Sequence, residues 1–224
     1  MSAAFFDVDG TVTRTNIVMY YFRYRRETLR GISRVAWLAG FSLKCCGFLV
    51  VDWISRPAFN RWFYQSYTGI DAKHFRAWAA EAFEKITKPL IFPGAEAKIR
   101  EHQATGERVV FVTGSIEETV LPLARHLGVE DVIANRLEEK DGRFTGRLLG
   151  GAMAGDAKVE AMRSVDTDID LSRSYAYSDS LSDIAMLEAV GHPVAVNPSP
   201  QLRLQAQRAG WPIEKWPTNG QEKS

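Results

Sequence analysis

The sequence predicts an α/β fold, in which a Rossmann-like parallel sheet is sandwiched by helices and a helical cap is inserted near the amino terminus. Three observations predict it. Residues 3–6 form a short apolar run that ends at two aspartates and a glycine, as a buried strand ends at a turn. Residues 15–89 show apolar positions only at helical spacing. After Pro93-Gly94, apolar strands alternate with helical segments, which favours a parallel sheet covered on both faces.

The expected domain organisation follows from these changes of pattern. Residues 1–14 and 90–224 form the core, and residues 15–89 form the helical cap. Within the cap, Phe59 and Phe63 are four positions apart with other aromatic residues between and after them, which is typical of one face of an amphipathic helix. No alternation of apolar and polar residues indicates a strand in this stretch.

The core elements are predicted in chain order. Helices are marked by apolar positions of helical spacing, and strands by short apolar runs. Asp141-Gly142, between two apolar positions, is a hairpin turn signal. The predicted helices cover residues 95–105, 117–127, 157–163 and 182–189, and the predicted strands cover residues 108–113, 131–134, 174–178 and 193–196.

Length, charge and cysteine content exclude several classes of protein. The 224 residues suit one domain, or a core with one insertion. Because 28 Lys and Arg residues are balanced by 27 Asp and Glu residues, a globally basic nucleic-acid binder is not expected. Cys45 and Cys46 are adjacent, so they give neither a metal-ligand spacing nor a disulfide framework. The amino terminus has no signal-like core, and we expect a cytoplasmic protein.

Residues 35–54 are the most membrane-like segment, but they are not expected to span a bilayer. Lys44 lies in the middle, where a lysine costs about 3 kcal/mol, and the apolar runs on either side are too short. Residues 20–34, just before this segment, combine arginines with aromatic side chains. Two interpretations stay open: a helical subdomain with a solvated arginine face, or a cap that makes peripheral contact with a membrane.

Three predicted strands end in polar residues at the same edge of the sheet. The ends read Asp7-Val8-Asp9-Gly10-Thr11, Thr113-Gly114-Ser115 and Ser178-Asp179-Ser180. Ligands of open α/β sheets bind outside this edge. Clustered carboxylates favour a hard cation such as Mg²⁺, backbone amides after the strands favour an anion, and Lys158 is the candidate to complete charge neutralisation. Together these features indicate a phosphoryl-transfer site.

The same residues form four motifs that resemble those of the haloacid dehalogenase (HAD) superfamily. The first is Phe-Phe-Asp-Val-Asp-Gly-Thr at residues 5–11, and the second is Phe-Val-Thr-Gly-Ser at residues 111–115. The third is Lys158, and the fourth is Ser-Asp-Ser-Leu-Ser-Asp at residues 178–183. The helical cap inserted between the first and second motifs is similar to that of subfamily IB, the phosphoserine-phosphatase-like hydrolases. The motifs occur in the order of the family and cover nearly the whole chain.

The resemblance implies an enzyme that hydrolyses phosphate monoesters through an aspartyl-phosphate intermediate. Asp7 would be the nucleophile, and Asp9 would protonate the leaving oxygen and later deprotonate the attacking water. Asp7, the backbone region at Asp9, and Asp179 would hold the Mg²⁺ cofactor. Asp183 would orient Lys158 or the waters of the metal.

The resemblance also implies which residues bind the phosphoryl group. Gly10, Thr113 and Gly114 would hold its oxygens, and Lys158 would neutralise both the nucleophile and the transferring group. The partner is then a small-molecule or lipid phosphate, and the aromatic cap selects it because the core site contacts mainly phosphate.

The sequence departs from the phosphoserine phosphatase pattern on the substrate side. Asn16 lies nine residues after Asp7, where that type of enzyme usually has a glutamate for the ammonium group of the substrate. We therefore expect a small or amphiphilic phosphate monoester rather than phosphoserine. Arg56 and Arg61 are candidates for contacting a substrate anion, with salt links along a helix face as the favoured interpretation. Two other functions stay open: a phosphotransferase or mutase on the same fold, and a membrane-interface binding protein with a HAD-like core.

Overall fold

The structure is a computed structural model that describes residues 1–218, except the side chains of Leu43, Cys46, Leu49, Val50, Asp52 and Trp53. Of the two adjacent cysteines, the side chain of Cys46 therefore lies outside the described residues. Over the described range, strands and helices alternate along the core as the sequence predicted.

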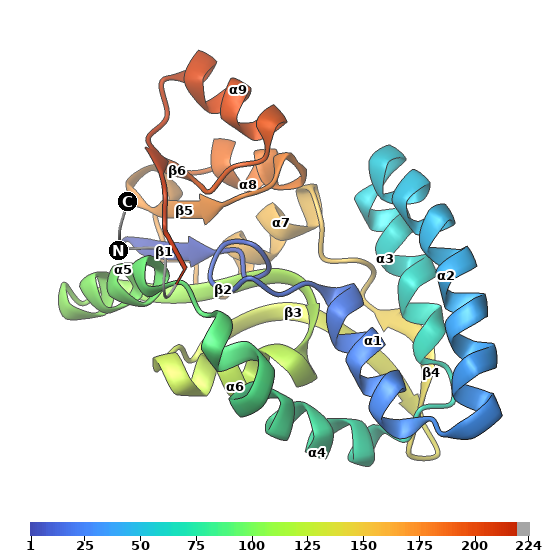
Figure 1. Cartoon of the computed structure of the whole chain (residues 1–224). Helices are drawn as coiled ribbons and strands as arrows, with labels where there is room; N and C mark the ends of the chain where they lie inside the picture. Colours follow the sequence, from blue (N-terminus) through green and yellow to red (C-terminus); the bar gives the residue numbers. More distant parts are fainter. Residues whose placement is uncertain (219–224) are drawn as a thin grey trace.

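One sheet runs through the centre of the core. Its strands are β1 (Ala3–Phe6), β2 (Arg108–Ile116), β3 (Asp131–Lys140), β4 (Arg143–Leu149), β5 (Tyr175–Ser178), β6 (His192–Val196) and β7 (Ile213–Glu214). They lie in the order β4-β3-β2-β1-β5-β6-β7 (Figure 1). All neighbouring strands pair in parallel except β3 and β4, which form the hairpin predicted at Asp141-Gly142. The predicted α/β fold is confirmed.

Helices cover both faces of this sheet because side chains alternate along each strand. Ala4 and Phe6 of β1 pack on one face with α5 (Pro93–Ala104) and α6 (Glu117–Leu127). Ala3 and Phe5 pack on the other face with three helices. These are α7 (Asp156–Val165), α8 (Ile184–Glu188) and α9 (Pro200–Ala209).

Residues 15–89, the expected insertion, are helical throughout their regular elements. They contain α1 (Ile17–Thr28), α2 (Gly31–Ile54), α3 (Arg56–Tyr64) and α4 (Ala72–Ala82), followed by a π-helical turn (Phe83–Thr87). Asn16, Ser55 and Asp71 begin three of these helices, and each side chain accepts a hydrogen bond from a backbone N–H three residues later. Within residues 1–218 no helix is both long and apolar enough to cross a membrane.

The core of the insertion is completed by the β3–β4 hairpin. Phe63, Tyr67 and Phe75 of the insertion are buried in one cluster with Phe144 of β4 and Leu137 of β3. The backbone joins the two parts as well, since the Gly69 N–H donates to the Phe144 carbonyl at 2.8 Å and the Phe144 N–H donates to the Ile70 carbonyl at 2.9 Å. In Figure 1 the hairpin accordingly extends from the sheet toward α1 and α3.

Two chain segments join the insertion to the core, and they lie side by side. The Arg14 N–H donates to the Leu90 carbonyl at 2.9 Å, and the Phe92 N–H donates to the Val12 carbonyl at 3.0 Å. The insertion therefore leaves and re-enters the core at one place, close to the carboxyl end of β1.

Candidate active site

Asp7 lies directly after β1 and is buried among charged groups. Its N–H donates to the Tyr177 carbonyl at 3.0 Å, which extends the pairing of β1 with β5 by one residue. Lys158 Nζ, on α7, donates to Asp7 Oδ1 at 2.7 Å and lies 2.8 Å from Asp183 Oδ1. The Ser178 hydroxyl donates to the other oxygen of Asp183 at 2.7 Å. The fold thus brings the first, third and fourth motifs into direct contact.

More negative than positive charge is buried at this point. Burial raises the pKa of Asp7 to about 8; Lys158 opposes this shift, while Asp183 and Asp179 add to it. Burial also raises the pKa of Asp179 to about 6, with Asp183 as the next cause. For Lys158 burial acts to lower the pKa, but the attraction of Asp183 and Asp7 outweighs it, and the pKa is raised. The site therefore favours the binding of protons or of a cation.

Asp179 follows β5 and lies beside the turn that follows β1. Its N–H donates to Thr11 Oγ1 at 3.0 Å, and that hydroxyl lies 3.2 Å from Asp179 Oδ1 and 3.5 Å from Asp7 Oδ2. Gly10 has a φ of +89°, and a Cβ at this position would lie 2.3 Å from Asp179 Oδ2. The missing side chain of Gly10 is what allows the two carboxylates to meet around one threonine hydroxyl.

The side chain of Asp9 is oriented by two hydroxyl groups. Thr15 Oγ1 donates to Asp9 Oδ1 at 2.8 Å, and the Ser115 hydroxyl donates to Asp9 Oδ2. Thr15 is held in turn by Thr13, whose Oγ1 lies 2.5 Å from its own. Asp9 lines the same pocket as Asp7. A carboxyl group fixed in this way suits proton transfer to or from a bound molecule.

The second motif, at the end of β2, is tied to the insertion. The Thr113 hydroxyl accepts a hydrogen bond from the Ser115 N–H at 3.1 Å. The Gly114 carbonyl accepts from the Tyr64 hydroxyl at 2.8 Å and from Asn135 Nδ2 at 2.6 Å. Burial raises the pKa of Tyr64 well above its ordinary value, so its hydroxyl keeps the proton that it donates. The position of α3 is thereby linked to the loop that is expected to hold phosphate.

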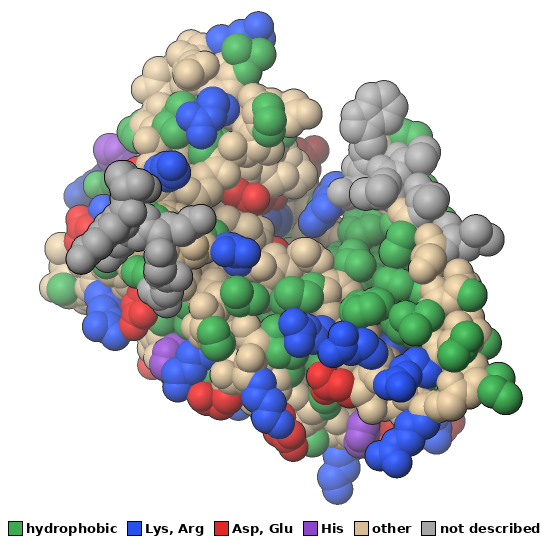
Figure 2. Space-filling model, in the orientation of Figure 1, with side chains coloured by type: hydrophobic (Ala, Val, Ile, Leu, Met, Phe, Trp, Pro, Cys, Tyr) green, Lys and Arg blue, Asp and Glu red, His purple; other side chains and the backbone are tan. Residues whose placement is uncertain are grey.

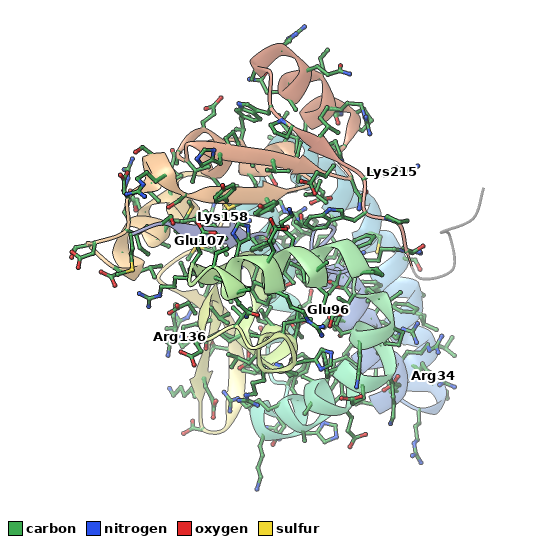
Figure 3. The ribbon with its side chains drawn as sticks, turned by 90° about the vertical axis from the view of Figure 1, so that its left-hand side faces the viewer. Arg34, Glu96, Glu107, Arg136, Lys158 and Lys215 are labelled. Carbon is green, nitrogen blue, oxygen red and sulfur yellow. The ribbon has the colours of Figure 1, made fainter. Side chains whose placement is uncertain are left out.

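All eight site residues that the sequence predicted line one pocket of about 330 Å³. They are Asp7, Asp9, Gly10, Thr113, Gly114, Lys158, Asp179 and Asp183. Figure 2 shows the surface hollowed between the core and the α2–α3 side of the insertion, with acidic and basic side chains on its walls. Figure 3 shows Lys158 among the strands near the middle of the molecule, whereas Arg34 lies at the outer edge of the insertion.

The insertion adds Arg56 and Asn60 to the pocket; Arg56 was named from the sequence as a candidate for contacting a substrate anion, but Asn60 was not assigned. Arg56 lines it, so the interpretation of this residue as part of a helix-surface salt link is incomplete. Asn60 also lines it and is 1% exposed, and neither polar atom of its side chain has a hydrogen-bond partner in the described part of the chain. The sequence does contain a signal for Asn60, since it is a polar residue between Phe59 and Phe63 on an apolar helix face.

The donor atoms of the pocket fit a hard cation such as Mg²⁺. The buried carboxylate of Asp7 and the half-buried carboxylate of Asp179 share Thr11 as a neighbour, and the site carries surplus negative charge. Among the described residues, no group of three or more His, Cys, Asp or Glu side chains is placed to hold a metal ion. A cation here would take its other ligands from the backbone near Asp9, from water and from substrate phosphate. Mg²⁺ binds proteins in this way, because it keeps several of its waters.

The fold and the pocket together define the class of the protein. A carboxylate after the first strand, a buried lysine beside it and a threonine-glycine loop on the next strand are the groups that phosphoryl transfer needs. The protein is an enzyme, a hydrolase. A model of the haloacid dehalogenase-like hydrolase family matches residues 4–188. The chain belongs to this family, which confirms the resemblance seen in the sequence.

Several relatives resemble most of the chain. It is 34% identical over 224 residues to the inhibition of morphological differentiation protein of Streptomyces azureus, with 95% of this chain and 77% of that protein covered. It is 30% identical over 226 residues to phosphoserine phosphatase SerB1 of Mycobacterium tuberculosis, with 95% and 70% covered. The solved structure of a protein of unknown function from Bordetella pertussis Tohama I is similar with a TM-score of 0.82 and 27% identity, over 95% of this chain and 97% of that chain.

Proposed function

We propose that the chain is a Mg²⁺-dependent phosphatase that hydrolyses a small or amphiphilic phosphate monoester through an aspartyl-phosphate on Asp7. The observation that carries this proposal is the contact of Lys158 Nζ with Asp7 Oδ1 at 2.7 Å, beside the half-buried carboxylate of Asp179. Such a group of charges suits the transfer of a phosphoryl anion to an aspartate. In this proposal residues 1–14 and 90–224 supply the catalytic core, and residues 15–89 act as its cap.

The reaction consists of two displacements at phosphorus. First, an Asp7 oxygen attacks the phosphorus, and the alcohol leaves with a proton from Asp9. Second, water attacks the phosphorus of the aspartyl-phosphate and gives a proton to Asp9, while the bond between Asp7 and phosphorus breaks and inorganic phosphate is released. The hydrogen bonds from Thr15 and Ser115 keep Asp9 oriented for both proton transfers.

The phosphoryl oxygens are bound by the groups around Asp7. Lys158 donates to them, held in place by its contact with Asp183 at 2.8 Å. The Thr113 hydroxyl and the backbone at Gly114 supply further donors in the same pocket, whereas the Gly10 N–H donates to the Thr13 carbonyl at 2.7 Å. When bound, Mg²⁺ offsets the charge of the carboxylates and of the phosphoryl oxygens.

Asn16 supports a substrate without an ammonium group. Its side-chain oxygen accepts a hydrogen bond from the Met19 N–H at 2.9 Å and so begins α1. Asn16 lines the pocket, and its NH₂ group remains for contact with a bound molecule. This group donates hydrogen bonds and carries no negative charge. A phosphoserine phosphatase is among the relatives, but this position does not provide a partner for the amino group of phosphoserine.

The test of the proposed function is the variant Asp7→Asn. We expect it to fold normally and to lose turnover of phosphate monoesters with Mg²⁺ by several orders of magnitude, because an amide does not attack phosphorus. In the natural chain, beryllofluoride with Mg²⁺ should form an adduct on Asp7, and a chelator should abolish activity. Turnover by Asp7→Asn at the rate of the natural chain would rule out this mechanism.

The two other functions, a phosphotransferase or mutase and a membrane-interface binding protein, can be distinguished from a hydrolase. A phosphotransferase would transfer the group from Asp7 to an added alcohol, so analysis of the products with and without alcohols distinguishes it from a hydrolase. The contact between Lys158 and Asp7 favours a catalytic role over a module that only binds membranes.

Peripheral contact with a membrane is proposed as an addition to catalysis. At the start of α2, Ile32 is 88% exposed and Val35 is 66% exposed, and Arg30 and Arg34 lie beside them on the surface. Apolar and cationic side chains in this arrangement can bind an anionic lipid surface. Co-sedimentation with anionic vesicles, with and without Arg30→Gln and Arg34→Gln, tests this contact. The cytoplasmic location stays a prediction.

A further inference from the structure

A second cavity lies beside the active-site pocket, and its walls are mainly apolar. It has a volume of about 420 Å³ and lies between α1, α2 and α3. Ile17 and Val18 of α1 line it together with Phe48 of α2 and Phe59 of α3. Figure 2 shows hydrophobic side chains gathered over these helices. Such a cavity binds a hydrocarbon group better than a polar one.

The cavity and the active-site pocket adjoin. Asn16, Ile17 and Arg56 line both of them. The guanidinium carbon of Arg56 lies 5.2 Å from the centre of the Phe59 ring, so the cation rests at the boundary between the polar and the apolar space. A molecule whose phosphate contacts Asp7 therefore has the apolar cavity within reach of its alcohol part.

Asn60 places a polar group on the pocket side of this boundary. It follows Arg56 by one helical turn, and its buried amide makes no hydrogen bond within the described residues. A Cβ on Gly114 would lie 3.1 Å from Asn60 Nδ2, which puts the amide against the loop expected to hold phosphate. A buried amide without a partner is unfavourable for the free protein. Because this amide lines the pocket, a bound molecule can supply the missing partners.

We propose that the substrate is the phosphate monoester of an amphiphilic alcohol with a single apolar chain. The chain binds in the cavity between α1, α2 and α3, and the Asn60 amide hydrogen-bonds the polar end of the alcohol next to the phosphate. This inference rests on the proposed function and narrows its substrate class from small or amphiphilic to amphiphilic.

A series of n-alkyl phosphates from ethyl to decyl, with the full chain and Mg²⁺, tests the cavity. We expect kcat/KM to rise about threefold to fourfold for each added methylene until the cavity is filled, because burial of one methylene group strengthens binding by about that factor. Hydrolysis at a kcat/KM that does not depend on chain length would overturn the inference and leave the proposed function standing. Hydrolysis of none of the series would overturn both.

Val18→Phe tests whether the cavity is the place where the chain binds. The larger side chain should occupy part of the space, so the ratio of kcat/KM for octyl phosphate to that for ethyl phosphate should fall about tenfold or more. Leu204→Phe is the control, since it places an aromatic ring at a position of α9 that is 48% exposed and outside the cavity. An equal ratio in both variants would overturn the assignment of the cavity.

Asn60→Leu separates a role in binding from a role in the fold. If Asn60 binds substrate, the variant should melt at the same temperature as the natural chain or higher, while kcat/KM for octyl phosphate falls about tenfold. A lower melting temperature with unchanged kcat/KM would show that Asn60 serves the fold, and would overturn its part in the proposal.

Discussion

Single residues at the active site show how strongly the fold concentrates charge. Lys158 contacts both Asp7 and Asp183, while Asp179 lies on the other side of Asp7 across Thr11. One buried cation therefore contacts two carboxylates, and a third carboxylate lies next to them. Such a cluster is stable only if protons or a further cation bind to it, and this requirement makes the site responsive to both pH and Mg²⁺.

The raised pKa of Asp7 predicts that the metal-free protein becomes less stable as pH rises. The folded protein holds this proton up to a pKa of about 8, against an ordinary value of 3.8. A group whose pKa is raised on folding stabilises the protein fully below its unfolded pKa, and this contribution is lost as pH rises through the folded pKa. We expect urea denaturation with a chelator present to show falling stability between about pH 4 and pH 8.

Two controls isolate the contribution of Asp7. Asp7→Asn should show a smaller fall over the same range, because the amide does not titrate. Saturating Mg²⁺ should also reduce the fall, since the cation takes the place of the protons. The prediction is contradicted if the stability of the natural chain rises with pH and follows the same curve as that of Asp7→Asn.

Alanine at Gly10 is predicted to have two effects, one from the backbone conformation and one from crowding against Asp179, and a second glycine separates them. Gly10 and Gly150 have φ values of +89° and +73°, but a Cβ would clash with Asp179 only at Gly10, and at Gly150 nothing lies within 4 Å. Alanine at either position should cost about 1–2 kcal/mol of stability for its backbone conformation. Gly10→Ala should in addition displace Asp179 and weaken Mg²⁺ binding at least tenfold, as measured by calorimetry. Equal Mg²⁺ affinity in the two variants would show that the crowding is relieved without moving Asp179.

The sequence identified the motif residues and named Arg56 as a candidate, but it did not identify Asn60, which the packing of α3 brings to the pocket. Parallel strands necessarily bring their carboxyl ends to one edge, so Asp7, Thr113 and Asp179 could be placed together without a structure. Asn60 and Arg56 reach the pocket only because α3 packs against the second motif through Tyr64. No spacing in the sequence specifies that contact, since it depends on how the insertion is oriented on the core.

Some secondary structure elements are determined by their local sequence, and others by pairing or packing with distant segments. The helix predicted at residues 117–127 is α6 at the same bounds, because apolar spacing and the following Gly128 define it locally. β2 and β3 are longer than predicted, since their polar ends are paired with neighbouring segments. α9 and β7 were not predicted. α9 buries only Leu202 and Ala206 in an otherwise polar sequence, and β7 has two residues that are ordered by pairing with β6.

The β3–β4 hairpin is predicted to stabilise the insertion. Phe144 is 1% exposed within the aromatic cluster of the insertion, whereas Leu149 of the same strand is 48% exposed. Phe144→Ala should cost about 3–5 kcal/mol, because it leaves a cavity among packed rings. Leu149→Ala is the control and should cost much less. Chemical denaturation followed by tryptophan fluorescence measures the loss of stability in both variants. Similar losses would mean that the hairpin contacts the insertion without completing its core.

At the scale of the whole molecule, the pocket lies between two bodies of packed side chains. One hydrophobic cluster fills most of the insertion and includes Leu137 and Phe144 of the hairpin, while Phe83 of the insertion packs in a cluster of the core. Two adjacent segments join the two parts near Arg14 and Leu90. Across the pocket, the hydrogen bond from Tyr64 to the Gly114 carbonyl links α3 to the second motif. Binding at Asp7 can therefore affect the insertion through this link as well as through the substrate itself.

Hydrogen exchange tests this coupling between the two bodies. Formation of the beryllofluoride adduct with Mg²⁺ should slow amide exchange at residues 113–115 and also in α3, because the Tyr64 hydroxyl bonds the Gly114 carbonyl at 2.8 Å. Tyr64→Phe should keep the protection at residues 113–115 and lose much of that in α3. α5 packs on the sheet away from the pocket and serves as the unchanged reference. Slowing confined to the core of the natural chain would show that the insertion does not respond to the phosphoryl site.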